Sequence, residues 1–168
     1  ALLRHQHSPR HHIYSVGMLC RAMSCPTPEL MNDALRVLYY LDRHADVGLR
    51  FEADEADMSG MSDSDWAVRH STSGNVFTYC RAAISWSSKK QPSVALSSCE
   101  AEIIAATDVT KEIIHLRLML AELSVRDHRP VEVQEDNQAC ILMGSGMKSS
   151  RAAKHYEVRL HFLQDSIK

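Results

Sequence analysis

The chain has 168 residues, of which 45% are hydrophobic and 24% are charged, a composition that excludes a wholly disordered chain. Nineteen Lys and Arg against 21 Asp and Glu give a formal net charge of -2, so no overall positive field would hold nucleic acid without a local patch or a partner. No apolar run is long enough to span a bilayer, and the five scattered cysteines include no C-x-x-C pair; we therefore expect an intracellular protein without a membrane partner, zinc finger or disulfide scaffold.

The first 50 residues predict one helix. Residues 1–12 hold four of the ten histidines in a polar stretch that contains Pro9, and a solvated tail is favoured over a metal site because no spacing places the histidines on one helical face. From Pro28, apolar residues recur at helical spacing until Gly48, which predicts an amphipathic helix over 28–45.

Residues 46–96 lack a helical period and predict strands. The strongest indication is a hairpin of 75–79 and 83–88 joined near Cys80-Arg81, with apolar side chains at alternate positions. Residues 58–63 are a weaker strand candidate, because Gly60 and two serines dilute the pattern. This region is therefore expected to supply three strands.

A long helix is expected next. Ser97-Ser98-Cys99-Glu100 fits a capping box, and the helix should run to about Leu123. Its expected apolar stripe contains Ala106, Val109, Ile113, Leu116, Leu120 and Leu123. One helical turn before Ala106 the same stripe reaches Glu102, so a carboxylate extends a face that should be buried.

The last third of the chain predicts one strand and two helices. Residues 131–136 alternate as a short strand, and Asn137 is expected to cap a brief helix that ends near Gly144. A final helix is expected to carry Tyr156, Leu160, Leu163 and Ile167. The order of helix, three strands, long helix, strand and two helices predicts a mixed α/β fold.

Three acidic residues lie where a solvated position is difficult to explain: Asp63 after a strand, Glu102 on the apolar stripe and Asp136 between a strand and a helix. Strand ends and helix starts converge in α/β folds, so these residues are candidates for one cluster. A divalent cation relieves the repulsion among carboxylates, and oxygen ligands suit Mg²⁺ or Mn²⁺. From the pattern alone, a turn residue, a helix-start acid and a cap remain the alternative interpretation.

Several motifs resemble the ribonuclease H domain of Ty1/copia-type retrotransposon Pol polyproteins, and they occur in that family's order. They are G-M-S-D-S-D-W-A (60–67), S-T-S-G (71–74), A-I-S-W-S-S-K-K-Q-P (83–92), A-L-S-S-C-E-A-E-I-I-A-A-T-D (95–108), E-D-N-Q-A (135–139) and K-H-Y-E-V-R-L-H-F-L (154–163). Upstream, residues 16–28 and 34–41 resemble the segment that links the reverse transcriptase of that family to its ribonuclease H. The resemblance covers nearly the whole chain.

The resemblance implies a connection segment over 1–50 and a ribonuclease H-like domain over 51–168, with a mixed sheet flanked by helices. It implies hydrolysis of the RNA strand of RNA/DNA hybrids during reverse transcription, with two Mg²⁺ ions or Mn²⁺ in their place. The implied catalytic and metal-binding residues are Asp63, Glu102 and Asp136, and lesser candidates are Asp65, His155 and Glu157.

The resemblance also implies partners and a departure from the pattern. Such domains continue into a fifth strand and a last helix with a fourth acid, whereas this chain ends at Lys168. We therefore expect weak or no activity from the chain alone, and an open sheet edge that permits self-association. The implied partners are an RNA/DNA hybrid and the reverse-transcriptase domain of the parent polyprotein, in the cytoplasm, a virus-like particle or the nucleus. The alternative is an inactive scaffold that binds nucleic acid or protein.

Overall fold

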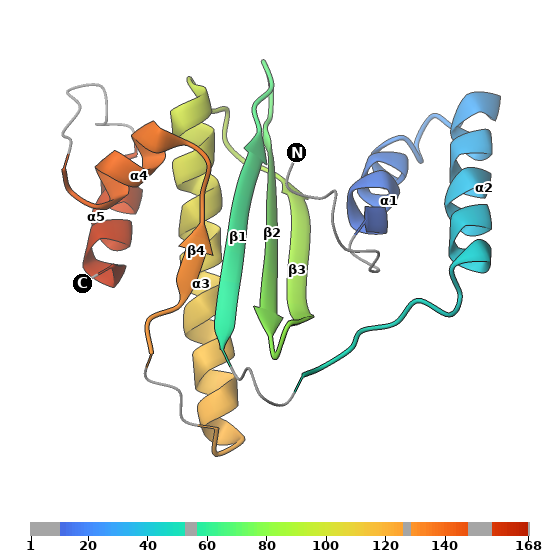
Figure 1. Ribbon diagram of the computed structural model, residues 1–168. Coiled ribbons are helices and arrows are strands. Elements are labelled where there is room, and N and C mark those ends of the chain that lie inside the picture. Colours follow the sequence, from blue (N-terminus) through green and yellow to red (C-terminus); the bar gives the residue numbers. More distant parts are fainter. Residues whose placement is uncertain (1–10, 53–56, 126–128, 148–155, 168) are drawn as a thin grey trace. The chain divides into compact units, whose positions relative to one another are not determined.

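The computed structural model describes residues 11–52, 57–125, 129–147 and 156–167. The chain divides into two compact units, Ala1–Phe51 and Glu52–Lys168 (Figure 1). Among the described residues, no helix combines the length and the apolar character that crossing a bilayer requires.

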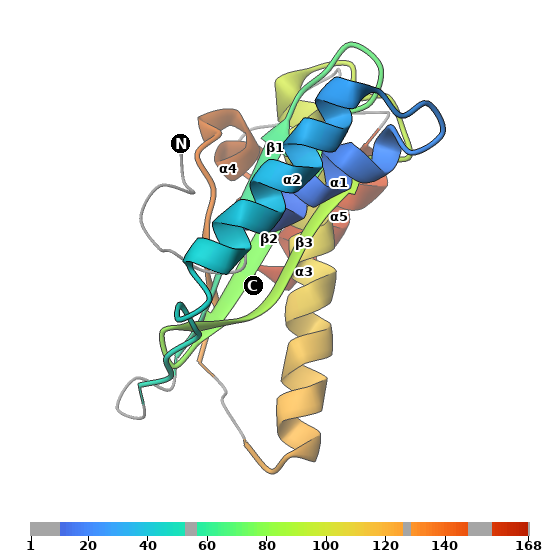
Figure 2. The same cartoon turned by 90° about the vertical axis from the view of Figure 1, so that its right-hand side faces the viewer.

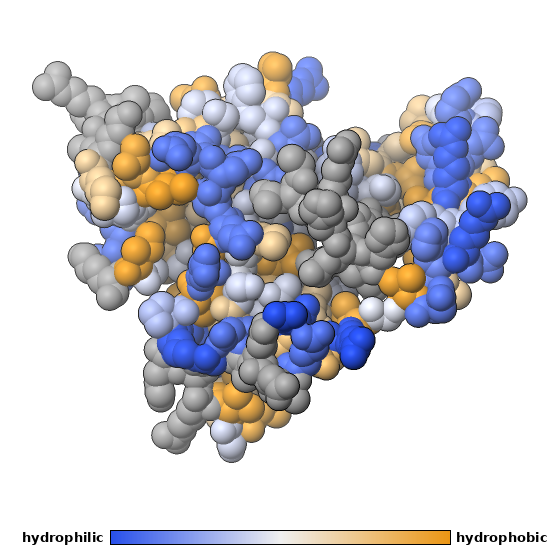
Figure 3. Space-filling model, in the orientation of Figure 1, coloured by the Kyte–Doolittle hydropathy of each residue, from blue (hydrophilic) through white to orange (hydrophobic). Residues whose placement is uncertain are grey.

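Over residues 11–51, the first unit forms two helices, α1 (His11–Arg21) and α2 (Pro28–Arg43). The hydroxyl of Thr27 accepts a hydrogen bond from the Leu30 amide at 3.3 Å and caps α2, whose first helical residue is proline. The helix expected over 28–45 is confirmed, although it ends at Arg43, whereas α1 was not predicted. None of residues 13–51 is buried, and Figure 3 shows hydrophobic residues at the surface over both helices.

Within its described residues, the second unit has a four-stranded mixed sheet and three helices, as the sequence predicted. The elements are β1 (Met58–Asp65), β2 (Thr72–Tyr79), β3 (Ala82–Lys90), α3 (Ser98–Glu122), β4 (Glu132–Gln134), α4 (Gln138–Gly144) and α5 (Glu157–Ser166). The strand order is β3-β2-β1-β4; β1 and β2 pair antiparallel, as do β2 and β3, and β1 pairs parallel with β4. This mixed α/β arrangement is consistent with a ribonuclease H-like fold.

The predicted hairpin forms and is longer than expected. Cys80 and Arg81 join β2 to β3 with φ angles of 50° and 62°, the left-handed values that a two-residue turn of type I′ requires. The strand expected to be weak, β1, extends to Asp65. Its Gly60 leaves the space that the Phe77 ring occupies, because a Cβ there would lie 3.1 Å from that ring. The glycine therefore supports the packing of this sheet.

The start of α3 is fixed by a capping arrangement close to the predicted one. The Ser97 hydroxyl accepts the Glu100 amide hydrogen bond at 3.1 Å. In return, the Glu100 carboxylate accepts from the Leu96 amide at 2.8 Å, one residue before the amide that a capping box uses. The helix ends at Glu122 with Leu123 as its C-cap, as expected, but Leu123 is exposed and does not belong to the buried stripe.

Helix α3 packs against the sheet and also against the helices α4 and α5, so it contributes to both main clusters of the core (Figures 1 and 2). Against the sheet it forms a cluster of Met58, Phe77, Val109 and Leu116. Against α4 and α5 it forms a second cluster of Ile103, Cys140, Met143, Tyr156, Leu160 and Leu163. Because the first turns of α3 are covered on both sides, Ile103 and Ile104 are buried although they lie outside the predicted stripe. Ile167, by contrast, is exposed.

Candidate metal centre

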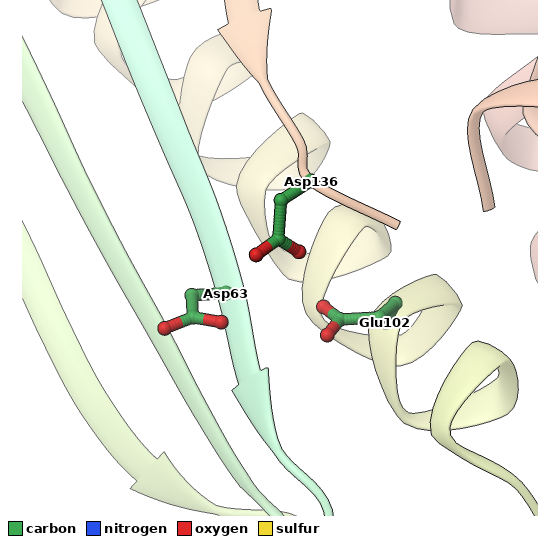
Figure 4. Close-up of side chains that lie close together, drawn as sticks. All are labelled: Asp63, Glu102 and Asp136. Atoms are coloured by element: carbon green, nitrogen blue, oxygen red, sulfur yellow. The ribbon is translucent and has the colours of Figure 1, made fainter. Parts of the chain in front are cut away.

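Three carboxylates from three different elements meet at one end of the sheet (Figure 4). Asp63 belongs to β1, Glu102 to α3, and Asp136 follows β4. One carboxylate oxygen from each lies within 4.8 Å of those from the other two. The structure thus brings together the three acids that the sequence singled out.

The parallel pairing of β1 with β4 sets Asp63 level with Asp136. Met61 pairs with Gln134, and each aspartate lies two residues further along its own chain. Successive residues of parallel strands advance together, so the two carboxylates reach the same end of the sheet. Both aspartates are exposed, which leaves this side of the cluster open to solvent.

Glu102 is held by the anchored first turns of α3. Gln91, which is 3% exposed, donates hydrogen bonds from its Nε2 to the Ala101 carbonyl at 2.9 Å and to the Ser73 hydroxyl at 2.8 Å. These bonds tie the helix to β2 directly beside Glu102. The glutamate is 5% exposed and lies on the buried side of the cluster.

The turn that carries Asp136 is held on both sides. The Glu135 Oε1 accepts a hydrogen bond from the Asn137 amide at 3.1 Å. Asn137 in turn caps α4, because its Oδ1 accepts from the Cys140 amide at 3.0 Å, which confirms the predicted cap. Asp136 therefore projects from a backbone segment with fixed flanks.

Burial and mutual repulsion disfavour the ionised carboxylates in this cluster. Burial raises the pKa of Glu102 to about 7, with further contributions from the charges of Glu135, Asp63 and Asp136. Burial also raises the pKa of Asp63, as does the neighbouring Asp136 charge. The Glu102 Oε2 atom is buried and has no hydrogen-bond partner among the described residues. Ionising all three acids together is therefore costly.

The donor set fits a hard divalent cation. The three groups supply only carboxylate oxygens, without the imidazole or thiolate that favours zinc and softer metals. A cation of this kind would satisfy the buried Glu102 oxygen and offset the repulsion among the three acids. Asp63, Glu102 and Asp136 are thus the residues that could hold Mg²⁺ or Mn²⁺.

Two of the lesser candidates, Asp65 and Glu157, do not belong to this group. Asp65 is the last residue of β1 and is exposed, and its charge contributes less than that of Asp136 to the raised pKa of Asp63. Glu157 lies exposed in the first turn of α5, where a carboxylate oxygen is 3.8 Å from His161 Nε2. His155 lies outside the described residues.

One acidic neighbour, Glu135, was not singled out from the sequence. Burial raises the pKa of its carboxyl, and its Oε2 atom is buried without a hydrogen-bond partner among the described residues. A signal was available, because Val131, Val133 and Glu135 alternate along the strand and place the glutamate in phase with apolar residues.

Comparison with known proteins relates the chain to transposon polyproteins. It is 34% identical over 158 residues to the retrovirus-related Pol polyprotein from transposon TNT 1-94 of Nicotiana tabacum, covering 92% of this chain and 12% of that protein. The corresponding polyprotein from transposon RE1 of Arabidopsis thaliana is 30% identical over 159 residues, covering 92% of this chain and 11% of the relative. The chain thus spans only about one tenth of these polyproteins. No family model matches the chain, and no solved structure does.

A shorter relative is covered over most of its length. The chain is 42% identical over 107 residues to the secreted RxLR effector protein 161 of Plasmopara viticola, which covers 61% of this chain and 75% of the relative. The chain therefore belongs to one family with that effector protein, and it is homologous to a segment of the Ty1/copia Pol polyproteins.

Proposed function

We propose that the second unit is a ribonuclease H module that hydrolyses the RNA strand of RNA/DNA hybrids with the help of divalent cations. The observation that carries the proposal is the group formed by Asp63, Glu102 and Asp136, whose carboxylate oxygens lie within 4.8 Å of one another. The homology to transposon Pol polyproteins supports a role in reverse transcription, with the reverse-transcriptase domain of the parent polyprotein as the proposed partner.

The cluster is arranged for a substrate that approaches from one side. Glu102 is buried, whereas Asp63 and Asp136 are exposed, so a phosphodiester would reach the site past the two aspartates. Two divalent cations, when bound, activate water and stabilise the leaving oxygen in phosphodiester cleavage. The chain itself would contribute the three ligand groups, held in place by the paired strands and by the anchored start of α3.

The direct test is cleavage of a labelled RNA strand in an RNA/DNA hybrid, with Mg²⁺ and then with Mn²⁺. We expect the chain alone to cleave weakly and only with the cation, and we expect this cleavage to fall at least about a hundredfold in Asp136→Asn and in Asp63→Asn, since each loses a charged ligand. Glu132→Gln is the matched control, because Glu132 lies exposed in β4 outside the cluster. Cleavage that survives both aspartate substitutions, or no cleavage by the folded chain, would contradict the proposal.

The effector relative supports a second candidate, an inactive scaffold that binds nucleic acid or protein. That relative shares 42% identity with this chain, and its name describes an effector rather than a polyprotein. If the chain binds a hybrid through phosphate contacts, affinity should fall steeply as salt is raised, with no cleavage at any cation concentration. Cleavage that requires Asp136 would exclude this candidate, and absence of hybrid binding at any salt would limit it to protein partners.

Self-association through a sheet edge is a further proposal for the same unit. Strands β3 and β4 are the outer strands of the sheet, and each is paired on one side within the described residues. Unpaired backbone groups at such an edge accept a strand from another chain. Light scattering should then give a dimer mass, and a monomer mass at high protein concentration would refute it.

A further inference from the structure

The Glu135 side chain is half-buried, and its hydrogen bond in the turn does not account for its charge. Its Oε1 accepts a hydrogen bond from the Asn137 amide at 3.1 Å, so the side chain reaches forward along the chain, past Asp136. Its Oε2 is buried and has no hydrogen-bond partner among the described residues. A glutamine could accept the same amide bond without placing a charge there. The hydrogen bond in the turn therefore does not explain why residue 135 is a glutamate rather than a glutamine.

The carboxylate of Glu135 is a neighbour of the acidic cluster rather than a member of it. It is not among the three residues whose ligand oxygens lie within 4.8 Å of one another. Its charge nevertheless raises the pKa of Glu102 more than the charge of either Asp63 or Asp136 does. Glu135 is thus a close electrostatic neighbour of the buried glutamate, although it is not one of the expected ligands.

A fully buried polar residue, Ser62, lies beside Glu135. The pairing of Met61 with Gln134 sets Ser62 level with Glu135, the residue that follows β4. Ser62 is 0% exposed, and its hydroxyl lowers the pKa of the Glu135 carboxyl, which partly offsets the rise that burial causes. Charges in such an environment are weakly screened, so a negative charge there acts strongly on a nearby cation.

We propose that Glu135 is a positioning residue of the cation site: its side chain holds the turn that carries Asp136, and its negative charge next to the three acids increases the affinity for the cation. The inference rests on the cation site of the proposed function. Residues that orient or surround metal ligands typically change metal affinity about 10- to 100-fold when they are replaced. Glu135 should act in this way through its hydrogen bond and its charge together.

The test is calorimetric titration of the full chain with Mn²⁺ after treatment with EDTA. We expect Glu135→Ala to weaken binding at least about tenfold, since it loses both the amide contact and the charge. Glu135→Gln keeps an acceptor for the Asn137 amide and should weaken binding less. Glu132→Gln, which removes an exposed glutamate from the same strand, should bind as the wild type does.

Melting in EDTA separates this role from a merely structural one. Glu135→Gln removes one of several like charges, so the cation-free variant should melt at the same or a higher temperature while binding Mn²⁺ more weakly. Unchanged Mn²⁺ affinity in Glu135→Gln would overturn the proposed role of the charge. A fall in both melting temperature and affinity in that variant would also overturn the inference, because a general structural defect explains it.

The proposed function and this inference fail in different ways. If both Glu135 variants bind Mn²⁺ like the wild type while Asp136→Asn does not bind and the wild type cleaves a hybrid, the inference is wrong and the function stands. If Mn²⁺ affinity depends on Glu135 but the wild type cleaves no hybrid, the function is wrong and the inference stands. A wild type that binds no Mn²⁺ refutes both.

Discussion

The two units differ in what their helices have to pack against. In the first unit α2 presents apolar residues at helical spacing, yet none of residues 13–51 is buried. In the second unit α3 buries nine residues between the sheet and the helices α4 and α5. Amphipathic spacing alone therefore does not produce a core, because a helix needs a sheet or further helices to cover its apolar face.

The better packing of the second unit allows it to hold like-charged carboxylates close together. Repulsion and desolvation among Asp63, Glu102 and Asp136 oppose folding, and only a well-packed unit can offset that cost. The buried contacts of α3 and the four-stranded sheet supply this offset in the second unit.

Removing a core ring should destabilise only the second unit strongly. Phe77 is 0% exposed between β1 and α3, so Phe77→Ala should lower the free energy of unfolding by about 3–5 kcal/mol in a urea titration followed by circular dichroism. Leu38→Ala in α2 is the control, because Leu38 is 61% exposed, and it should change stability by less than about 0.5 kcal/mol. Equal effects of the two changes would remove the contrast between the units.

A side chain at Gly60 should disturb the contact between β1 and β2. A Cβ there would lie 3.1 Å from the Phe77 ring, so Gly60→Val should cost about 1–3 kcal/mol by the same titration. Gly48 in the first unit has nothing within 4 Å of an added Cβ, and Gly48→Ala should be neutral or slightly stabilising. A harmless Gly60→Val would show that Phe77 does not need this space.

The acidic cluster should make the cation-free protein less stable as pH rises. The pKa of Glu102 is about 7 in the folded chain against an ordinary value of 4.5, so the folded state binds more protons between these values and stability falls as pH increases from about 4.5 to about 7. Glu102→Gln removes this dependence and should stabilise the protein by about 1–2 kcal/mol above neutral pH in EDTA.

Thermal melts at several pH values in EDTA measure this effect. Glu122→Gln at the exposed end of α3 should leave the pH dependence unchanged. Added Mg²⁺ or Mn²⁺ should stabilise the wild type more than Glu102→Gln, since the variant lacks one charged ligand. A wild-type melting temperature that rises with pH through this range would contradict the account.

Removing a helix cap should have a smaller effect than the core substitutions, and the effect should differ between the two units. Ser97→Ala removes the acceptor for the Glu100 amide at the start of α3 and should lower the stability of the second unit by about 1 kcal/mol. Thr27→Ala removes the equivalent acceptor at α2, where no residue is buried, and should leave the melting of the second unit unchanged. A loss from Thr27→Ala as large as that from Ser97→Ala would show that the two units unfold together.

Local signals predicted most elements of the second unit. The capping residues Ser97 and Asn137 were placed correctly, and the alternating residues around Cys80-Arg81 predicted the hairpin. These features depend on hydrogen bonds and steric preferences within a few residues, so a sequence records them directly. The sequence also predicted that the three acids lie together, because Glu102 occupies a position on the apolar stripe and the order of the motifs supported the grouping.

Features that depend on contacts between distant segments were missed. Ile103 is buried because it packs against α4 and α5, and Ile104 is buried in a separate cluster with Ala95 and Ala101, which a single stripe does not reveal. Helix α1 was missed because its polar, histidine-rich beginning resembles a tail. Glu135 was missed although it alternates in phase with Val131 and Val133, and its electrostatic relation to Glu102 of α3 arises only in the folded unit.

The measurement that tests the central claim most directly is a crystal structure of the chain soaked with Mn²⁺, with the ion located by its anomalous scattering. The account expects an anomalous peak between Asp63, Glu102 and Asp136, and no peak there in a crystal of Asp136→Asn. A wild-type crystal with these three carboxylates in place and no Mn²⁺ between them would contradict it.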